Sequence, residues 1–515
     1  MSSTLDAPRH AARTPLPEGP ARRLGDHLPF LVVLAAGLAL RGLVTYAVRP
    51  GLEFAQDSFE YLWDAAHPGL RDVVHPTGYP TFLRLVAAAG RHFTLVAVAQ
   101  HLLGVAMGLA TYALVRRLGA GRWGGAVAAA PVLLGGYQVV VEHFILSDVV
   151  FEALLVAAVT VVLWPARPSW RSAVAGGLLL AAADLTRTVG IAVVPVLAGY
   201  LLWRRAGGRV VVAFVAAVAA PLAAYAGWFD AGTGHFGLEA YDGYFLAGRV
   251  EPIADCRGLQ LPAAEAALCP KGDAGSEGPD WYTWSPDSPL RNPDLHAADR
   301  NAVALAYAER MLAHRPFAYA GSVAGDFWSY LVGYTASDGV PGRDQTWLVP
   351  TSVPAAAWAP EYPPANPYIW EWSWPGNVAV TENRTLAVHG FDEGQVPAVV
   401  HHGPAEALHD YGRWVFLPGL AVLGAAVVAA WASVVALRRR RRHEVAPRVV
   451  ALLAGGLALL ALTTATAGRD PRYLLPVALL VWPAGVLGSG LLVSARRAAP
   501  GRLSRTRSTR TAPAS

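Results

Sequence analysis

The chain alternates between long apolar runs and short polar connections. Most runs are about 17 to 25 residues long, the length that an α-helix needs to cross the hydrocarbon core of a bilayer. Residues 172–203 are too long for one span and short for two, so we expect a hairpin of two short helices that turns near Arg187. The pattern predicts an all-α multi-pass membrane protein with about ten transmembrane helices. The predicted spans are 28–47, 94–116, 123–141, 147–164, 172–186, 188–203, 209–228, 413–437, 448–466 and 473–494.

Arginine residues are concentrated in alternate connections, and this distribution orients the predicted spans. Arg and Lys gather in the cytoplasmic loops of membrane proteins. With ten crossings and a cytoplasmic N-terminus, the arginine clusters near 116–122, 167–171, 204–209 and 438–442 and the basic C-terminal tail all fall inside. We therefore expect both termini in the cytoplasm of a plasma-membrane protein. The segments expected outside are 48–93, 142–147, the turn near 187, 229–412 and 466–473.

The longest polar stretch, residues 229–412, is rich in Trp, Tyr, Pro and Asp and is long enough for a separate domain. Within it, 292–316 predicts an amphipathic helix that ends at Pro316, and the apolar segment that follows could lie on the membrane surface. We expect a mixed α/β or irregular extracytoplasmic domain. The predicted division is a disordered cytoplasmic tail (1–27), an N-terminal membrane module (28–228), the extracytoplasmic domain (229–412), C-terminal membrane helices (413–495) and a basic cytoplasmic tail (496–515).

The composition fits a membrane protein and argues against a nucleic-acid-binding protein. Hydrophobic residues make up 54% of the chain and charged residues 15%, whereas soluble proteins have about a quarter charged residues. The net charge of +5 comes from arginines at helix ends and in the tails, so we do not expect nucleic-acid binding. Heavy use of Ala, Gly, Val and Arg, with Lys271 as the only lysine, indicates a GC-rich bacterial genome.

The two cysteines, Cys256 and Cys269, both fall in the extracytoplasmic stretch. Outside the cytoplasm a close pair is most simply a disulfide, with two free thiols as the alternative. Neither arrangement implies redox catalysis. Two further ligands at suitable spacing are missing, so a zinc site is not expected, and no metal ligand is assigned elsewhere.

The first predicted outer loop contains more titratable groups than a connection needs. Asp57 follows the first span by about ten residues, which places it close to the outer membrane surface. Partial desolvation there makes a carboxylate a usable base. If the segment is helical, Tyr61 lies one turn beyond Asp57, with Glu60 beside it. The alternative is a solvated interfacial helix with ordinary surface acids.

Four segments in order resemble the GT-C superfamily. The first is "D-x-x-x-Y-x-x-x-A", from Asp57 to Ala65, followed by "HPTGYPTFLRLV" at 75–86. The others are "HFILSDVVFEALL" (143–155), "DLTRTVGIAVVPVL" (184–197) and "RDPRYLLPVALL" (469–480). GT-C proteins are multi-pass glycosyltransferases that take sugars from polyprenyl-phosphate carriers, and they include mannosyltransferases and aminoarabinose transferases. The resemblance covers about residues 25–228 and 413–495.

The resemblance implies an inverting glycosyltransferase in which Asp57 is the general base. Asp148 corresponds to the second acid, which is usually Glu, and its alternative role is as the N-cap of the fourth span. Glu60, Tyr61 and Tyr473 are implied as substrate-binding residues. The expected partners are a polyprenyl-phosphate sugar donor, a glycan, lipid or protein acceptor, and the lipid bilayer. No cofactor is expected, and dependence on a divalent metal stays open.

Three arginines and one histidine are candidates for binding the donor phosphate. Arg469 and Arg472 lie on the predicted outer side, against the usual charge bias, and so need partners. Guanidinium groups match phosphate oxygens with paired hydrogen bonds, whereas Asp470 can neutralise only one of the two. Arg187 interrupts an apolar run, and its partner is either a phosphate or Asp184, three residues earlier. His75 could bind the donor phosphate or an acceptor hydroxyl, or simply pack.

Three other functions are alternatives to a glycosyltransferase of this kind. A flippase or transporter of a lipid-linked glycan should place ionisable residues along a path through the bilayer and show repeat symmetry, whereas here the acids cluster at one face and no repeat is evident. A non-catalytic binding protein could keep the same membrane fold, although Asp57 at the matching position argues against it. An enzyme resembling an O-antigen ligase fits the acidic first loop less well.

Overall fold

A computed structural model of the protein describes most of the membrane part and much of the remainder. The described residues are 20–66, 69, 74–270, 278–285, 288–291, 300–333, 347–352, 378–380, 399–438 and 444–497.

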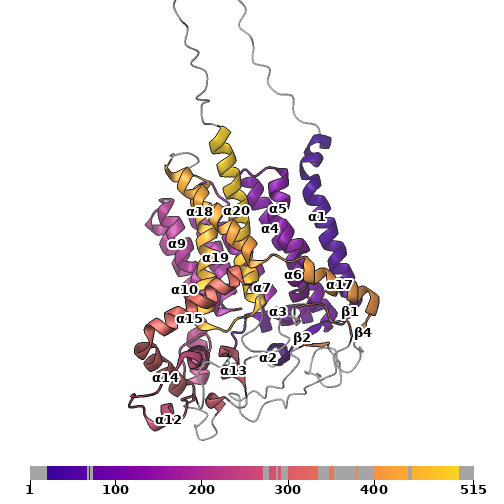
Figure 1. Ribbon diagram of the computed structural model, residues 1–515. Coiled ribbons are helices and arrows are strands. Elements are labelled where there is room, and N and C mark those ends of the chain that lie inside the picture. The colour runs from indigo at the N-terminus through magenta and orange to yellow at the C-terminus, as the bar shows by residue number, and fades with distance from the viewer. Residues whose placement is uncertain are drawn as a thin grey trace, which may run out of the picture.

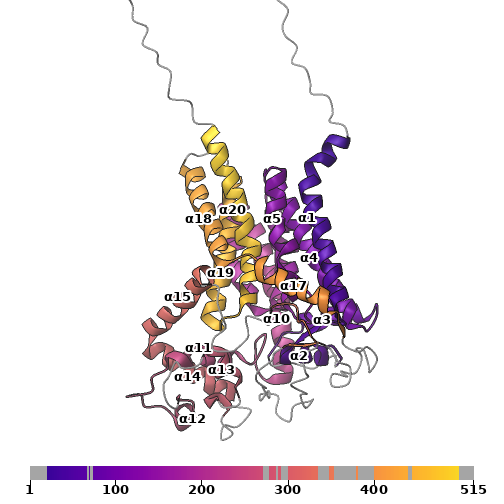
Figure 2. The same ribbon diagram turned by 45° about the vertical axis from the view of Figure 1, so that its right-hand side comes forward.

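Long apolar helices form an upright bundle (Figure 1). Six of the described helices are long and apolar enough to cross a membrane. Figure 2 shows α18, α19 and α20 on one side of the bundle and α1, α4 and α5 on the other. These long helices are α1 (Pro20–Ala47), α4 (Phe93–Arg117), α10 (Gly208–Thr233), α18 (Gly419–Arg438), α19 (Ala446–Thr466) and α20 (Leu474–Arg497).

Shorter apolar helices fill the remaining predicted spans. They are α5 (Arg122–Leu134), α6 (Gly136–Val141), α7 (Asp148–Leu163), α8 (Trp170–Asp184), the 3₁₀ turn η1 (Thr188–Ala192) and α9 (Val193–Trp203). The expected hairpin over 172–203 is present as α8 and η1–α9, with Arg187 between them. All ten predicted segments are therefore helical, while ten crossings remain a prediction.

Two predicted spans differ in their course. The span at 123–141 is broken at Gly135, whose extended backbone (φ −62°, ψ 121°) separates α5 from α6. The span expected at 413–437 begins only at Gly419. The preceding α17 (His402–Trp414) is a separate amphipathic helix, and the connection contains Pro418. At the other predicted domain boundary, α10 continues beyond residue 228 to Thr233.

Arginines at the ends of three other helices, α4, α9 and α19, gather at one end of α7. Arg117 donates to the carbonyl of Trp164, Arg204 to that of Ala166, and Arg448 to those of Leu163 and Pro165. Such carbonyls at a helix C-terminus lack partners within the helix and carry partial negative charge, which guanidinium groups satisfy. Asp148 lies at the other end of α7, about 24 Å away along the helix axis. The bundle thus has an arginine-rich end and an acidic end.

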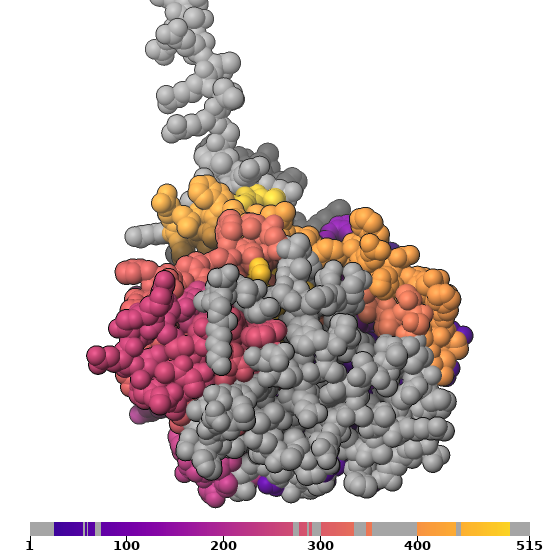
Figure 3. Space-filling view, turned by 60° about the horizontal axis from the view of Figure 1, so that its bottom comes forward, coloured from indigo at the N-terminus to yellow at the C-terminus, as the bar shows by residue number. Residues whose placement is uncertain are grey.

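Small helices cover the acidic end, opposite the start of α1 and the end of α20 (Figure 1). Viewed from that end, the helices of 242–332 lie on one side and α17 on the other (Figure 3). The helices are α2 (Ala55–Ala66), α3 (Gly78–Ala87), α11 (Asp242–Val250), α12 (Ala263–Ala266), α13 (Pro279–Trp284), α14 (Arg300–His314) and α15 (Pro316–Val332), with 3₁₀ turns η2 (Glu251–Ile253) and η3 (Pro289–Arg291).

The described part of the predicted 229–412 domain is mainly helical. Tyr241, Tyr244 and Tyr307 are among the residues of its apolar core, and Cys256 is bonded to Cys269 as a disulfide. The predicted helix at 292–316 is α14, which starts at Arg300 and ends before Pro316, while residues 292–299 lie outside the described ranges. The apolar segment that follows is α15, on which Phe317 and Trp328 are exposed.

Two short strand pairs join this stretch to the N-terminal module. β1 (Val48–Arg49) pairs antiparallel with β4 (Val399–Val400). β2 (Leu52–Phe54) pairs antiparallel with β3 (Val378–Val380). The late part of the predicted outer domain therefore hydrogen-bonds to the chain that follows α1, immediately before α2.

The arrangement predicts opposite accessibility for two exposed positions, His402 at the start of α17 and Arg438 at the end of α18. The native cysteines are bonded to each other, so only an introduced cysteine should react with a maleimide. We expect a membrane-impermeant maleimide to label His402→Cys in intact cells and Arg438→Cys only after permeabilisation. Labelling in the reverse order would put the acidic end in the cytoplasm.

Candidate active site

A backbone junction connects the loops that carry Asp57 and Asp148. The Leu52 N–H donates to the carbonyl of His143 at 3.0 Å, and the Ile145 N–H donates back to the carbonyl of Leu52 at 2.8 Å. Ser58, on α2 next to Asp57, donates its hydroxyl to the Ile145 carbonyl. The segment 52–58 and the turn 142–147 are therefore held in one register.

Gln100, buried within α4, supports this turn from inside the bundle. Its amide nitrogen donates to the carbonyls of Glu142 (3.0 Å) and Phe144 (2.5 Å). Its amide oxygen accepts a hydrogen bond from the Tyr79 hydroxyl at 2.8 Å. One side chain thus satisfies two carbonyls of the turn that cannot reach water, and connects them to α3.

A second buried network holds the same turn from the side of α1. Arg41 makes a two-pronged contact with Glu142, with nitrogen–oxygen distances of 2.8 and 2.6 Å. Glu142 also contacts His101 Nδ1 at 2.9 Å, and His101 Nε2 lies 3.1 Å from His143 Nδ1. The other ring nitrogen of His143 lies 2.9 Å from the carbonyl of Val48. This chain of polar contacts links α1, α4 and the turn through buried side chains.

Acids and arginines from four separated segments meet at this junction. Arg187 binds Asp148 at 2.7 Å. The Arg472 guanidinium lies 3.6 Å from carboxylate oxygens of both Asp57 and Asp148, and 3.7 Å from Asp470. The side chain of Asp57 is 25% exposed, against 5% for Asp148 and 0% for Asp470. Of these three acids, Asp57 is the one that an incoming molecule can reach.

The guanidinium of Arg472 lies among aromatic rings. Its central carbon is 4.7 Å from the ring centre of Phe54, 5.3 Å from that of Trp347 and 5.2 Å from that of Tyr473. Ring faces attract a desolvated cation. Nonetheless, Nε and Nη1 of Arg472 have no hydrogen-bond partner among the described residues, because the acids stand slightly too far away. Arg472 is thus a buried cation with unused donors.

The structure contradicts one alternative for Asp148, the N-cap role, and one for Arg187, the pairing with Asp184. Ser147 occupies the N-cap position of α7 and makes no side-chain cap hydrogen bond, while Asp148 is the first helical residue and binds arginine. The suggested pairing of Arg187 with Asp184 is wrong. Arg187 lies beyond the end of α8 with extended backbone angles (φ −150°, ψ 121°), so the two residues do not share a helix face.

Tyr61, Glu60 and His75 form a group beside the cluster. The Tyr61 hydroxyl is 2.9 Å from the Ser147 hydroxyl, and its ring centre is 4.7 Å from that of His75. His75 Nδ1 lies 2.6 Å from the Glu60 carboxylate. Burial raises the pKa of Tyr61 to about 12, so Tyr61 is a neutral hydrogen-bonding group at physiological pH. The Glu60 contact orients the His75 ring.

Arg469 pairs with a different acid from those around Arg472. Its guanidinium lies 3.4 Å from Asp326 on α15, and Asp326 also binds the buried Arg249 at 2.7 Å. Asp470 is held by backbone contacts, since its N–H donates to the Tyr330 hydroxyl at 2.8 Å and its carboxylate accepts from the Arg472 N–H. The structure therefore brings Asp57, Asp148, Arg187, Arg472 and Tyr473 together, and attaches Arg469 to α15.

Sequence reasoning missed the residues that support the cluster from within the bundle. Gln100 and His101 are polar residues inside the apolar span 94–116, which was a usable signal, since buried polar groups in a membrane need partners. Phe54, Trp347 and Asp326 carried no such signal. Within the described residues, no group of three or more His, Cys, Asp or Glu side chains is arranged to hold a metal ion.

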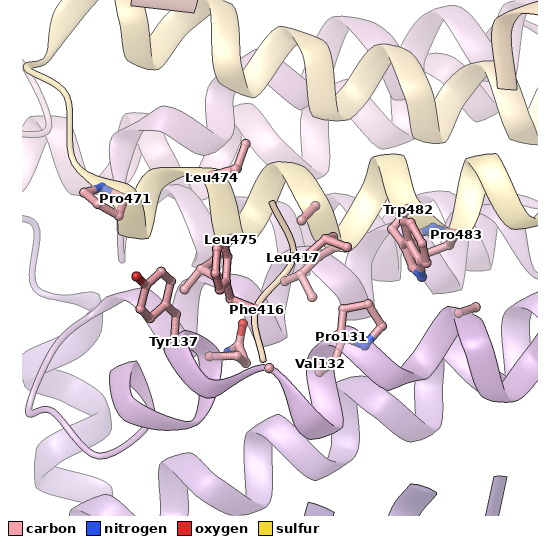
Figure 4. Close-up of a pocket in the computed structure, with 15 residues that line it drawn as sticks. Pro131, Val132, Tyr137, Phe416, Leu417, Pro471, Leu474, Leu475, Trp482 and Pro483 are labelled. Atoms are coloured by element: carbon pink, nitrogen blue, oxygen red, sulfur yellow. The ribbon is translucent and has the colours of Figure 1, made fainter. Parts of the chain in front are cut away.

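An apolar groove lies against the same end of α20 (Figure 4). It is narrow, with a cavity volume of about 30 Å³, and lies between α5, α6, α20 and the connection at 416–417. Pro471 and Leu474, which flank Arg472 and Tyr473 along the chain, line one end, and Trp482 and Pro483 line the other. The amide of Gln138, also in the wall, donates to Glu152.

Comparison of the sequence with known proteins finds no relative. No family model matches the chain, and no curated protein matches it. Among solved structures, the Saccharomyces cerevisiae protein O-mannosyltransferase Pmt1–Pmt2 complex bound to the sugar donor is similar, with 17% identity and a TM-score of 0.33. ArnT from Cupriavidus metallidurans bound to undecaprenyl phosphate is also similar, with 15% identity and a TM-score of 0.31.

The two likenesses differ in extent. The first covers 46% of this chain and 37% of the mannosyltransferase chain, so the chain spans well under half of that protein. The second covers 89% of this chain and 77% of the ArnT chain. At these TM-scores neither likeness carries weight for the chemistry of the cluster around Arg472, which stands on its own geometry.

The role of Gln100 can be tested by Gln100→Leu, which keeps the size of the side chain and removes its hydrogen bonds. Two turn carbonyls would lose their partner, so we expect a loss of about 2–4 kcal/mol in stability and faster hydrogen exchange at 142–147. The measurements are the unfolding midpoint in detergent and exchange by mass spectrometry. Ser433→Ala is the control, because Ser433 is buried in α18 and its hydroxyl donates to the Ala429 carbonyl of the same helix. Unchanged exchange at the turn in Gln100→Leu would contradict this role.

Proposed function

We propose that the protein is an inverting glycosyltransferase that moves a sugar from a polyprenyl-phosphate carrier to a hydroxyl acceptor at the outer face of a bacterial plasma membrane. Synthesis of a cell-envelope glycan or glycolipid is the setting that fits such a reaction. The observation that carries the proposal is the convergence of Asp57, Asp148, Arg187 and Arg472 at the acidic end of the bundle. The order of the GT-C-like segments in the sequence supports it.

In this proposal Asp57 is the general base. The acceptor hydroxyl gives its proton to the Asp57 carboxylate as its oxygen forms a bond to the anomeric carbon of the sugar. The bond between that carbon and the phosphate oxygen breaks, and the electron pair leaves with the polyprenyl phosphate. Asp57 suits this role because it is the most exposed acid of the cluster, while Asp148 is buried and already bound to Arg187.

The two arginines of the cluster would bind the donor phosphate. Two nitrogens of Arg472 have no hydrogen bond to any described residue, and phosphate oxygens would supply the acceptors. Arg187 is 22% exposed and lies at the same carboxylate, Asp148. Asp148 and Asp470 then fix the directions of the two guanidinium groups. Tyr61, Glu60, His75 and Tyr473 border this space, where the sugar and the acceptor would bind.

The apolar groove supports a donor with a long hydrocarbon tail. It starts at Pro471 and Leu474, next to Arg472, and follows α20 into the apolar part of the bundle. A phosphate held by Arg472 would therefore place the first isoprene units at the mouth of the groove. Burial of such a chain against Leu475, Phe416 and Leu417 contributes affinity in proportion to its area.

A transporter of a lipid-linked glycan remains the competing proposal, together with a non-catalytic binding protein. The buried contacts of Arg41, Glu142, His101 and His143 lie inside the bundle, as a transport path would require. These side chains, however, bind one another and hold the 142–147 turn. Sugar transfer by the purified protein from a polyprenyl-phosphate sugar to an acceptor would separate the enzyme from both alternatives.

Replacement of the proposed base tests the mechanism. Asp57→Asn keeps the size of the side chain but removes its ability to accept a proton. We expect turnover at saturating donor to fall by about 10² to 10⁴-fold with little change in donor binding. The matched control is Asp230→Asn, which alters an exposed acid at the end of α10. Near wild-type turnover in Asp57→Asn would rule out Asp57 as the base and turn attention to Asp148 or Glu60.

Replacement of the proposed phosphate ligand should affect binding instead. Arg472→Lys keeps the positive charge that the three acids require but loses the paired donors of guanidinium. We expect the donor to bind about 10 to 100-fold more weakly, in line with loss of charge-assisted hydrogen bonds. Arg469→Lys should have a much smaller effect, because Arg469 contacts Asp326 rather than the cluster. Equal effects of the two variants on donor affinity would argue against a specific phosphate site at Arg472.

A further inference from the structure

A proline in the sequence explains the position of the Trp482 ring at the far end of the groove. Pro131 lies inside α5 and has no N–H to donate to the carbonyl four residues earlier, that of Val127. Within apolar helices such a carbonyl needs another donor. The indole N–H of Trp482, on α20, donates to the Val127 carbonyl at 2.8 Å. This bond crosses from α20 to α5 and fixes the Trp482 ring where the groove stops.

The groove therefore has a defined length. Along α20 it extends from Pro471 to Trp482, through one 3₁₀ turn and about two helical turns, or roughly 18 Å. In Figure 4 the Pro471 ring lies at one end, and Trp482 and Pro483 at the other, with Leu475 and Leu417 between them. An extended geranyl chain is shorter than this span, a geranylgeranyl chain is comparable with it, and an undecaprenyl chain is much longer.

We propose that Trp482 is a specificity-determining residue that ends the lipid-tail site, so that only the first few isoprene units of the carrier contact the protein. The inference rests on the proposed function for the identity of the ligand, a polyprenyl phosphate. The walls of the groove are apolar, and the amide of Gln138 is bonded to Glu152, so a hydrocarbon chain meets few unsatisfied polar groups there. Beyond Trp482 the tail turns out into the bilayer.

Binding of a series of prenyl phosphates to the full-length protein in detergent tests this site without requiring turnover. The probes are geranyl, geranylgeranyl and undecaprenyl phosphate. For the wild type we expect affinity to rise by about tenfold or more from geranyl to geranylgeranyl, because apolar area is buried, and then to level off. In Trp482→Ala the groove is extended, so affinity should continue to rise by about tenfold up to undecaprenyl.

Trp482→Phe tests the contribution of the aromatic ring separately from that of its hydrogen bond. Phenylalanine keeps an aromatic stop but cannot donate to Val127, so we expect a lower unfolding midpoint together with the wild-type plateau in affinity. A profile of Trp482→Ala that matches the wild type would overturn the inference. So would a Trp482→Phe profile that matches Trp482→Ala, since the ring would then not be the stop.

Failure of the proposed function gives a different result from failure of this inference. If the wild type shows the plateau in binding but transfers no sugar from any prenyl-phosphate donor, the enzyme proposal is wrong and the lipid-tail site stands. If the wild type transfers sugar but binds all three prenyl phosphates equally, the catalytic proposal stands and the role of Trp482 is wrong.

Discussion

The organisation of the acidic end depends on one buried cation. Arg472 is almost fully enclosed, and removing a guanidinium from water costs several kcal/mol unless opposite charges and hydrogen bonds compensate. Its acids come from positions 57, 148 and 470, and its aromatic neighbours from 54, 347 and 473. The need to stabilise this charge therefore draws together the segment after α1, the start of α7, the turn before α20 and a residue of the stretch predicted to lie outside. Within the part of the chain that the structure describes, the same arrangement leaves two nitrogens of Arg472 without a hydrogen-bond partner.

A second constraint, the satisfaction of backbone carbonyls away from water, determines the remaining geometry. Gln100 and the network of Arg41, Glu142, His101 and His143 support a turn whose position decides where Asp148 lies. The same rule operates at Pro131, where the unpaired carbonyl of Val127 attracts Trp482 and links α5 to α20. The support of the candidate site and the bond between Trp482 and α5 thus follow from one property of peptide groups in an apolar environment.

The opposite ends of α7 show how charge is divided along the bundle. Arg117, Arg204 and Arg448 bind carbonyls at its C-terminal end, whereas Asp148 begins its N-terminal end, where the helix dipole favours an anion. This division separates the arginine-rich connections from the acids. For the same reason, the distribution of arginine along the chain is sufficient to predict an orientation in the membrane.

The sequence by itself was enough to predict the apolar helices, the two short helices around Arg187 and the disulfide between Cys256 and Cys269. It also named Asp57 and Arg472 as candidate site residues, and the structure places their side chains 3.6 Å apart. Each of these follows from local information: run length, charge at helix ends, cysteine proximity and short motifs. Only the tertiary structure decided that Arg187 pairs with Asp148 instead of Asp184, and that Arg469 pairs with Asp326. Spacing of three residues implies a shared face only within a continuous helix, and α8 ends at Asp184. Contacts between residues far apart in the chain depend on how helices pack, which no local pattern records.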